Sequence, residues 1–330
     1  MKKILIVYNP RSSRFKDVEA GVFREVRAEK GVLVGKFEVQ PTTPTENAEK
    51  LAEIIQGGEL VLTAGGDGTA TIGMNGVILA REKFGKEAVF SAVAYGGFND
   101  LPRALGELET GEVLRKFKAG EESEFYPLEV KADGKHIWYP AVYFTMGMMA
   151  ESIKVFEEPK VRKQLRTGKK GIFFSGRKLF FWYLKNKRKK FLKEFSLLKT
   201  ENIIKKEIFN NKTSDYVAMN GVTMAKMVKI PRSSGGKRYF QEREEFWSGT
   251  ERFGSFLRLL RVGFIQGVLR GKISGGETRG DLIRFKKPAR VFLHAEGEGR
   301  ELREVSEVSV KKIEKPIRVI RIERRKDERK

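Results

Sequence analysis

The sequence predicts two domains, an α/β domain built on a parallel sheet and then a mainly β domain. Over about the first 115 residues, short β-branched runs alternate with helical patterns, which is typical of a parallel sheet covered by helices. From about Glu124 onward, strand patterns follow one another with turn signals between them. The length of 330 residues also fits two domains of roughly 150 residues each.

The first predicted strand is Ile4–Tyr8, and it ends at Asn9-Pro10 because a residue before proline avoids the α region. A helical pattern of apolar residues then runs from Phe15 to Val26. The second strand is predicted at Val32–Val39.

The next helix has a clear start signal. Thr43 is a predicted N-cap, Pro44 fits the first helical position, and Glu46 completes a capping box. This helix is expected to reach about Gln56, and two further strands are predicted, Leu60–Thr63 and Ala88–Ala94.

The later strand candidates lie beyond this α/β region. They are Phe125–Val130, His136–Thr145, Ala289–Ala295 and Leu302–Val310, with a turn at Ala132–Lys135 between the first two. We therefore expect an α/β domain over residues 1–120, a second domain over 121–310, and a final segment over 311–330 that ends in a charged tail.

Composition restricts the classes of partner. Lys and Arg number 66 against 43 Asp and Glu, a formal charge of +23, which favours phosphate-bearing small molecules, nucleic acid or an anionic membrane surface. Cysteine is absent and there are two histidines, which excludes disulfides, thiol catalysis and Cys- or His-rich metal sites. The first apolar run is too short for a signal peptide and no run is long enough to span a bilayer, so we expect a cytoplasmic protein.

The most informative motif is a glycine-rich loop that directly follows the third strand and precedes a helical segment. It comprises Gly65, Gly66, Asp67, Gly68 and Thr69. Glycines let the backbone approach a ligand, and the N–H groups at a helix start carry partial positive charge toward a phosphate. Asp67 suits a partner for Mg²⁺ or a base toward an attacking hydroxyl. A purely structural turn is the alternative, and the strand–loop–helix context favours phosphate binding.

A second polar loop, Tyr95–Arg103, follows the next strand of the same predicted sheet. Asn99 and Asp100 in this loop also suit a helix cap, which is the structural alternative. Both loops should open on the same edge of the sheet, so we interpret them jointly as one nucleotide site.

These motifs resemble, in sequence and order, those of the diacylglycerol, sphingosine and related lipid kinases. Asn9-Pro10-Arg11-Ser12 is similar to the family's Asn-Pro-x-Ser, and Gly65–Thr69 matches its Gly-Gly-Asp-Gly-Thr. Asn75-Gly76 falls where the family's next helix carries Asn-Gly. Gly96, Asn99, Asp100 and Arg103 resemble its Gly-Thr-Gly-Asn-Asp-x-x-Arg segment, and Glu296-Gly297-Glu298 resembles its Asp-Gly-Glu.

The resemblance implies a nucleotide-binding α/β domain, a C-terminal β-sandwich for the lipid, and a last strand that returns to the first domain near Lys315–Ile320. It implies Asp67 and Glu296 as candidate catalytic bases, and Asp100 and Glu298 as residues that help to place Mg²⁺. The residues that it implies for ATP binding are Asn9, Pro10, Ser12, Gly65, Gly66, Asp67, Gly68, Thr69, Gly96 and Asn99.

Several positions depart from the family pattern. Gly97 and Phe98 stand where the family has Thr-Gly, and Ile72 replaces a glutamate in the helix after the glycine loop. Arg14 lies near a usual glycine, and Glu296 replaces Asp. The family's Asp-Asp-Gly metal segment has no counterpart, because the corresponding stretch reads Arg243–Trp247.

A basic and aromatic segment, Lys160–Lys193, carries 14 Lys or Arg and no acid. Cations beside exposed rings suit the interface of an anionic membrane, and each cation near the surface contributes about 1 kcal/mol. A solvated face of a buried helix and a nucleic-acid patch are the alternatives. The expected membrane-facing residues are Lys169, Lys170, Phe180, Phe181, Trp182, Lys187, Arg188, Lys189 and Lys190.

Together these observations predict an ATP- and Mg²⁺-dependent lipid kinase that phosphorylates a hydroxyl of a diacylglycerol-like or long-chain-base-like lipid at the membrane surface. The alternative is an inactive relative that binds lipid or nucleic acid, with an NAD kinase favoured less. The expected partners are the lipid and an anionic membrane, with nucleic acid disfavoured and a homodimer left open. His136 and His294 are not assigned to the site.

Overall fold

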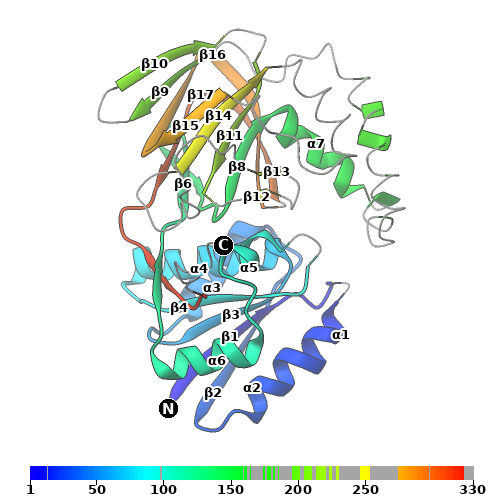
Figure 1. The fold of residues 1–330 in the computed structure, drawn as a ribbon, viewed down its shortest axis with the longest axis vertical. Coiled ribbons are helices and arrows are strands. Elements are labelled where there is room, and N and C mark those ends of the chain that lie inside the picture. The colour runs from blue at the N-terminus through cyan, green and yellow to red at the C-terminus, as the bar shows by residue number, and fades with distance from the viewer. Residues whose placement is uncertain are drawn as a thin grey trace, which may run out of the picture. The chain divides into compact units, whose positions relative to one another are not determined.

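The computed structural model divides the chain into two units (Figure 1), and each is described by itself. The first comprises Met1–Pro127 with Ile313–Lys330, and the second comprises Leu128–Lys312. The residues that the structure describes are 1–12, 14–96, 99–158, 160–161, 164, 174, 177–179, 181–182, 185, 195–200, 204–209, 213–220, 223–224, 228–229, 246–252, 274–296 and 298–322.

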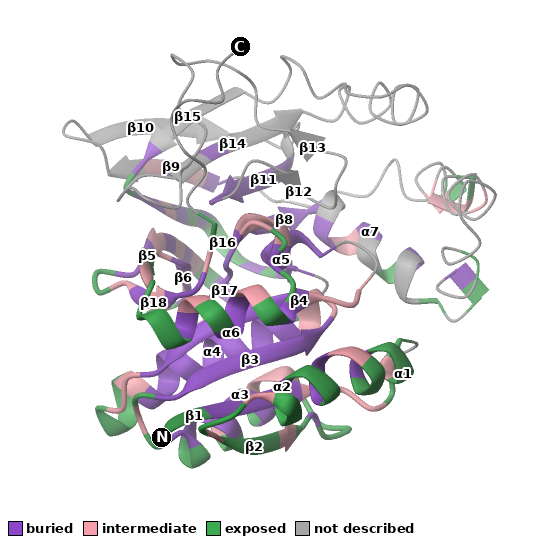
Figure 2. Ribbon diagram, turned by 60° about the horizontal axis from the view of Figure 1, so that its bottom comes forward, coloured by how far each residue is buried: buried purple, intermediate pink, exposed green. Residues whose placement is uncertain are grey.

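The first unit contains a six-stranded sheet in the order β2-β1-β3-β4-β18-β5. The predicted parallel sheet is confirmed, because the first four strands are mutually parallel. They are β1 (Lys2–Tyr8), β2 (Val32–Glu38), β3 (Leu60–Gly65) and β4 (Val89–Ala94). Strand β3 is buried along its whole length, whereas the edge strand β2 is largely exposed (Figure 2).

Helices cover both faces of this sheet. The segments α1 (Phe15–Val18), η1 (Glu19–Phe23) and α2 (Arg24–Ala28) share a core with α6 (Thr110–Ala119) and with one face of β1 and β3. Helices α3 (Pro44–Ile54) and α4 (Asp67–Phe84) lie on the other face. The predicted capping box is confirmed, because the Thr43 side chain accepts the Glu46 N–H and the Glu46 side chain accepts the Thr43 N–H.

One difference from the prediction is that the helical segment from Phe15 is not uniform. Its middle part, Glu19–Phe23, is a π-helix. The apolar spacing that predicts a helix does not distinguish α from π winding, which depends on what the turn packs against.

The chain returns to the first unit near its end. Strand β18 (Ile317–Val319) pairs in parallel with β4 and antiparallel with β5 (Ser123–Phe125). Because β5 is part of this sheet, the first unit extends to Pro127 rather than to residue 120.

The second unit is an antiparallel sheet region of ten strands. Its described helix is α7 (Met148–Glu157). Strand pairing centres on the two long strands β16 (Gly280–Ala295) and β17 (Glu298–Lys312). The other strands are β6 (Leu128–Ala132), β7 (Lys135–Trp138), β8 (Tyr143–Gly147), β9 (Phe195–Thr200), β10 (Ile204–Phe209), β11 (Thr213–Met219), β14 (Phe246–Arg252) and β15 (Ser274–Thr278). A small separate ribbon pairs β12 (Thr223–Met224) with β13 (Val228–Lys229).

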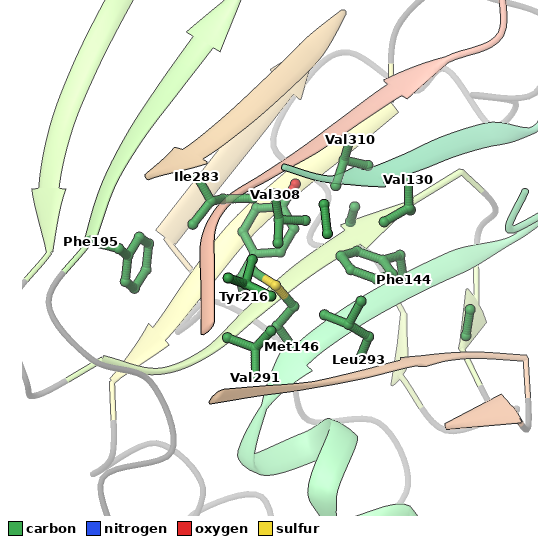
Figure 3. Close-up of a cluster of buried hydrophobic side chains, with 14 of the residues drawn as sticks. Val130, Phe144, Met146, Phe195, Tyr216, Ile283, Val291, Leu293, Val308 and Val310 are labelled. Atoms are coloured by element: carbon green, nitrogen blue, oxygen red, sulfur yellow. The ribbon is translucent and has the colours of Figure 1, made fainter. Parts of the chain in front are cut away.

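Apolar side chains from the strands of this sheet form one buried cluster (Figure 3). Its side chains come from well-separated strands, such as Phe144 on β8, Phe195 on β9 and Val308 on β17. Register shifts between Arg284 and Val291 bend β16, so one long strand pairs with β9 at one end and with β8 at the other. The mainly β second domain is thus confirmed as an antiparallel sheet region with this cluster as its core.

Two strand predictions were too long. Phe125–Val130 is divided at Pro127 into β5 and β6, and His136–Thr145 is interrupted around Pro140 between β7 and β8. Proline has no N–H to donate to a neighbouring strand, which explains both interruptions.

Candidate active site

The glycine-rich loop lies where the sequence predicts it, between β3 and α4. Gly66 is the N-cap of α4 and Asp67 is its first residue. The first N–H groups of a helix have no partner inside it, so Asp67, Gly68 and Thr69 present donors at the carboxyl edge of the sheet. A Cβ on Gly65 would lie 2.7 Å from Oγ1 of Thr69, so this tight turn needs glycine there.

The second loop contacts the first directly. The Tyr95 N–H donates to the Gly65 carbonyl at 3.0 Å. A Cβ on Gly96 would lie 2.4 Å from Cα of Gly66 and 2.7 Å from Oδ1 of Asn99. The two loops therefore meet backbone to backbone, as expected for loops after neighbouring parallel strands.

Asn99 shapes the second loop. Its backbone is left-handed, with φ of 54°, and its Oδ1 accepts the Gly96 N–H at 2.7 Å. Asn tolerates this conformation better than most residues. Asn99 therefore folds the turn that starts α5 (Asp100–Ala104). Gly97 and Phe98 lie outside the described residues.

The carboxylate of Asp67 connects the two loops. Its Oδ1 accepts the Leu101 N–H at 3.2 Å. Burial, with a smaller contribution from the negative charge of Asp100, raises the pKa of Asp67 to about 6, and the N–H groups at the start of α5 oppose the shift. A carboxyl group with a pKa near neutrality suits proton transfer at physiological pH.

Asp100, which is expected to help place Mg²⁺, has a charged partner in this unit. Its side chain is buried, and its Oδ1 lies 3.2 Å from Nη1 of Arg103. Arg103 also lies 3.4 Å from Glu107, through Nε and Oε1. Asp100 and Arg103 both belong to α5, so their ion pair stabilises the start of this helix beside the Asp67 loop.

The loop after β1 forms a compact turn at the same edge of the sheet. Oδ1 of Asn9 accepts the Arg11 N–H at 3.0 Å, and the Asn9 carbonyl accepts the Ser12 N–H at 3.0 Å. Tyr8 pairs with Ala64 across β1 and β3, so Asn9, Pro10 and Ser12 follow directly beside the strand that leads into the glycine loop.

A contact that the sequence does not reveal joins this turn to the second loop. The guanidinium of Arg14 lies 5.3 Å from the centre of the Tyr95 ring, within range of a cation–π interaction. A Cβ on Gly21 would lie 2.6 Å from Oη of Tyr95, so the π-helix presents a glycine where the ring packs. The sequence signal at this position is that Arg14 lies near a usual glycine of the family.

The other two expected site residues belong to the second unit. Glu296 is 1% exposed, and its Oε1 accepts the Val142 N–H and, at 3.4 Å, the Tyr143 N–H. Glu298 is the first residue of β17 and is partly exposed. Within this unit the two carboxylates therefore have different surroundings.

Most of the expected membrane-facing residues lie outside the described part of the chain. These are Lys169, Lys170, Phe180, Lys187, Arg188, Lys189 and Lys190. Phe181 is described and is 56% exposed, with the Arg177 guanidinium 5.7 Å from its ring centre, and Trp182 is partly exposed. Within the described residues, no helix has the length and apolarity needed to cross a membrane.

The described residues hold no group of three or more His, Asp or Glu side chains arranged to bind a metal ion. Nucleotide-bound Mg²⁺ usually needs one or two carboxylates beside the phosphates. Asp67 fits such a contact because it stands half-buried at the start of α4 beside helix N–H groups. The Asp100 carboxylate fits it less well, because Arg103 already pairs with it.

The first unit of the chain matches a known family of catalytic domains. Residues 3–128 match the family model of the diacylglycerol kinase catalytic domain. Kinases of such a family take ATP, usually with a divalent metal. A search of curated proteins finds no match.

Solved structures match over nearly the whole chain. A diacylglycerol kinase from Bacillus anthracis str. Sterne has a TM-score of 0.62 and 11% identity, covering 98% of this chain and 97% of that one. A presumed diacylglycerol kinase from the same organism has a TM-score of 0.65 and 13% identity, covering 98% of both chains. The resemblance seen in the motifs is thus confirmed for residues 3–128 as a match to the diacylglycerol kinase catalytic domain, and the whole chain shares the fold of these structures.

Proposed function

We propose that this protein is an ATP-dependent lipid kinase that transfers the γ-phosphate to a hydroxyl of a diacylglycerol-like or long-chain-base-like lipid. The observation that carries this proposal is the backbone contact between the glycine-rich loop and the Gly96–Asn99 turn. It gathers helix N–H groups and the Asp67 carboxyl at one edge of the sheet. Phosphoryl transfer requires mainly such positioning and charge stabilisation.

In this proposal the first turn of α4 binds the phosphates through the N–H groups of Gly68 and Thr69. The backbone can approach the nucleotide because there are no side chains at Gly65, Gly66 and Gly96. Asn99 stabilises the second turn by accepting the Gly96 N–H. Asn9, Pro10 and Ser12 form the neighbouring wall. Mg²⁺ bound with ATP would neutralise phosphate charge.

Asp67 is also the proposed base. The lipid hydroxyl oxygen bonds to the γ-phosphorus as the bond from that phosphorus to the bridging oxygen of ADP breaks, and the hydroxyl proton passes to a carboxylate oxygen of Asp67. A pKa of about 6 leaves this carboxyl mostly ionised at pH 7 and still able to accept a proton.

The acceptor class is tested with purified lipids in mixed micelles. The wild-type chain should phosphorylate a diacylglycerol or a long-chain base with ATP and Mg²⁺, and should leave NAD unphosphorylated. Asp67→Asn keeps an oxygen to accept the Leu101 N–H and loses the base, so turnover should fall about 100-fold or more while the fold is kept. Phosphorylation of NAD instead of lipid would establish an NAD kinase, and ATP or lipid binding without turnover would establish an inactive relative.

A further inference from the structure

The turn that carries Glu296 has an unusual residue for its shape. Ala295 pairs with Glu298 across β16 and β17, so Glu296 is the first residue of the tight turn between these strands. Such loops favour Asn-Gly or Asp-Gly because their residues need positive φ. Glu296 nevertheless adopts φ of 49°. An Asp would suit this backbone better, so the longer side chain calls for another explanation.

The side chain of Glu296 supplies that explanation. Its Oε1 accepts the N–H groups of Val142 and Tyr143, at the entrance to β8. The same entrance is fixed by Asn220, whose N–H donates to the Val142 carbonyl at 2.7 Å and whose Nδ2 donates to the Ala141 carbonyl at 2.8 Å. The Glu296 carboxylate therefore ties the hairpin to the segment that precedes β8.

Glu298 is placed differently within the same hairpin. It is the first residue of β17 and is partly exposed. Its neighbour two residues on, Arg300, is anchored by a hydrogen bond to the Ile137 carbonyl at 3.1 Å and lies 4.9 Å from the Trp138 ring centre. A base must reach the reacting atoms, and burial of Glu296 to 1% exposure does not give it that reach.

We propose that Glu296 is a positioning residue that holds the β16–β17 turn against the entrance of β8, and that it is not the base of the reaction. The inference rests on the proposed kinase function, and it removes Glu296 from the candidate bases that the Asp-Gly-Glu resemblance implies. Position 296 then requires length and an acceptor oxygen, and negative charge is dispensable there.

Three variants test this assignment by lipid phosphorylation. Glu296→Gln keeps the length and an acceptor oxygen, so kcat should stay within about tenfold of wild type, whereas loss of a general base typically costs about 100-fold or more. Glu296→Asp keeps the charge and is one methylene shorter, so it should lose more activity than the Gln variant. Glu296→Ala removes the acceptor oxygen, so it should lose at least as much activity as the Asp variant. Activity retained by Glu296→Asp and lost by Glu296→Gln would overturn the assignment.

Hydrogen exchange gives a readout that does not depend on lipid turnover. The amides of Val142 and Tyr143 should exchange faster in Glu296→Asp and at the wild-type rate in Glu296→Gln. If wild type phosphorylates no lipid, the proposed function fails while this exchange ranking still decides the role of Glu296. Unchanged exchange in Glu296→Asp, or faster exchange in Glu296→Gln, would overturn it.

Glu304 provides a matched control. It is an exposed glutamate of β17 that also has positive φ, at 57°. Glu304→Asp and Glu304→Gln should leave both activity and the exchange of the Val142 and Tyr143 amides unchanged. An effect of Glu304→Asp equal to that of Glu296→Asp would show that shortening a glutamate in this hairpin is enough to cause the loss, and would contradict the anchoring role.

Discussion

Gly96 shows how a single residue determines the geometry of the candidate active site. A methyl group there would overlap Cα of Gly66 at 2.4 Å, and backbone atoms cannot move aside cheaply. We predict that Gly96→Ala separates the two loops and weakens ATP binding by at least about tenfold, since small misplacements cost that much or more. Isothermal titration with ATP measures this effect.

Gly111→Ala is the control for this variant. Gly111 lies in α6, and an added Cβ would meet only Oε2 of Glu25 at 3.5 Å, an ordinary contact. Because alanine favours helix, this variant should be as stable as wild type or more stable, with unchanged ATP binding. Equal ATP affinity in the Gly96 and Gly111 variants would contradict the role assigned to the backbone contact.

The buried side chain of His294 should make the stability of the protein depend on pH. Burial lowers the pKa of His294 to about 4, below its usual value of 6.5. Between these pH values the folded state binds fewer protons than the unfolded state. The free energy of unfolding is therefore highest above pH 6.5 and falls as the pH drops toward 4. Protonation of His294 alone lowers the free energy of unfolding by about 3 kcal/mol over that pH range.

The prediction is checked by urea denaturation at pH 7 and pH 4.5. His294→Gln cannot gain this proton, so its free energy of unfolding should fall less between the two pH values than that of wild type. An equal fall in both proteins would show that His294 is not the group responsible.

Residue types at the site were largely predictable from sequence, whereas their contacts were not. The glycine-rich loop has a local signature, since a strand, glycines and a helix follow one another along the chain. The contact of Arg14 with Tyr95 and the bonds from Val142 to Glu296 join segments distant in sequence. No local pattern encodes such contacts, because they form only when the sheets assemble.

At the level of elements, the returning strand β18 is held by a side chain from α4. Nη1 of Arg81 donates to the carbonyls of Lys315 at 2.9 Å and Pro316 at 2.7 Å. We predict that Arg81→Ala lowers the free energy of unfolding by about 1.5–3 kcal/mol, as expected for hydrogen bonds from a charged group.

Lys83→Ala is the control for Arg81→Ala. Lys83 is on the same helix, and its ion pair with Glu49 is exposed on both sides. Removal of such a pair should change stability by about 0–1 kcal/mol. Guanidinium denaturation compares the two variants, and equal losses would contradict the proposed anchoring of β18.

The four parallel strands were predictable from sequence patterns, but strand ends were less predictable. Alternating hydrophobic runs and turn signals indicated β1 to β4 and the capped helix α3. Pro127 and Pro140 end strands that periodicity alone would continue, and β5 pairs with β18 from the far end of the chain. Pairing over such separations depends on the assembled sheet.

At the level of the whole molecule, the charge of +23 predicts binding to anionic surfaces. We propose that the basic and aromatic segment directs this binding to membranes. Flotation should recover the protein with phosphatidylserine vesicles and not with neutral vesicles, and added salt should weaken the recovery. Recovery with neither vesicle, together with retardation of RNA, would instead favour nucleic-acid binding.

Charge-removing variants locate this surface. Serine at four basic residues of the segment should reduce flotation more than serine at four exposed basic residues of the first unit, because the former group lies in the segment that is rich in aromatic residues. The first set is Lys187, Arg188, Lys189 and Lys190, and the second is Lys16, Arg24, Lys30 and Lys50. Equal reductions would show that net charge alone determines binding.

The central claim is phosphoryl transfer from ATP to a lipid hydroxyl, and one measurement tests it directly. The wild-type chain and Asp67→Asn are incubated with radiolabelled γ-phosphate ATP, Mg²⁺ and a total lipid extract in mixed micelles. We predict a labelled product in the organic phase with wild type and about 100-fold less with Asp67→Asn. No labelled lipid from a wild-type protein that binds ATP, or equal labelling by the variant, would contradict this account.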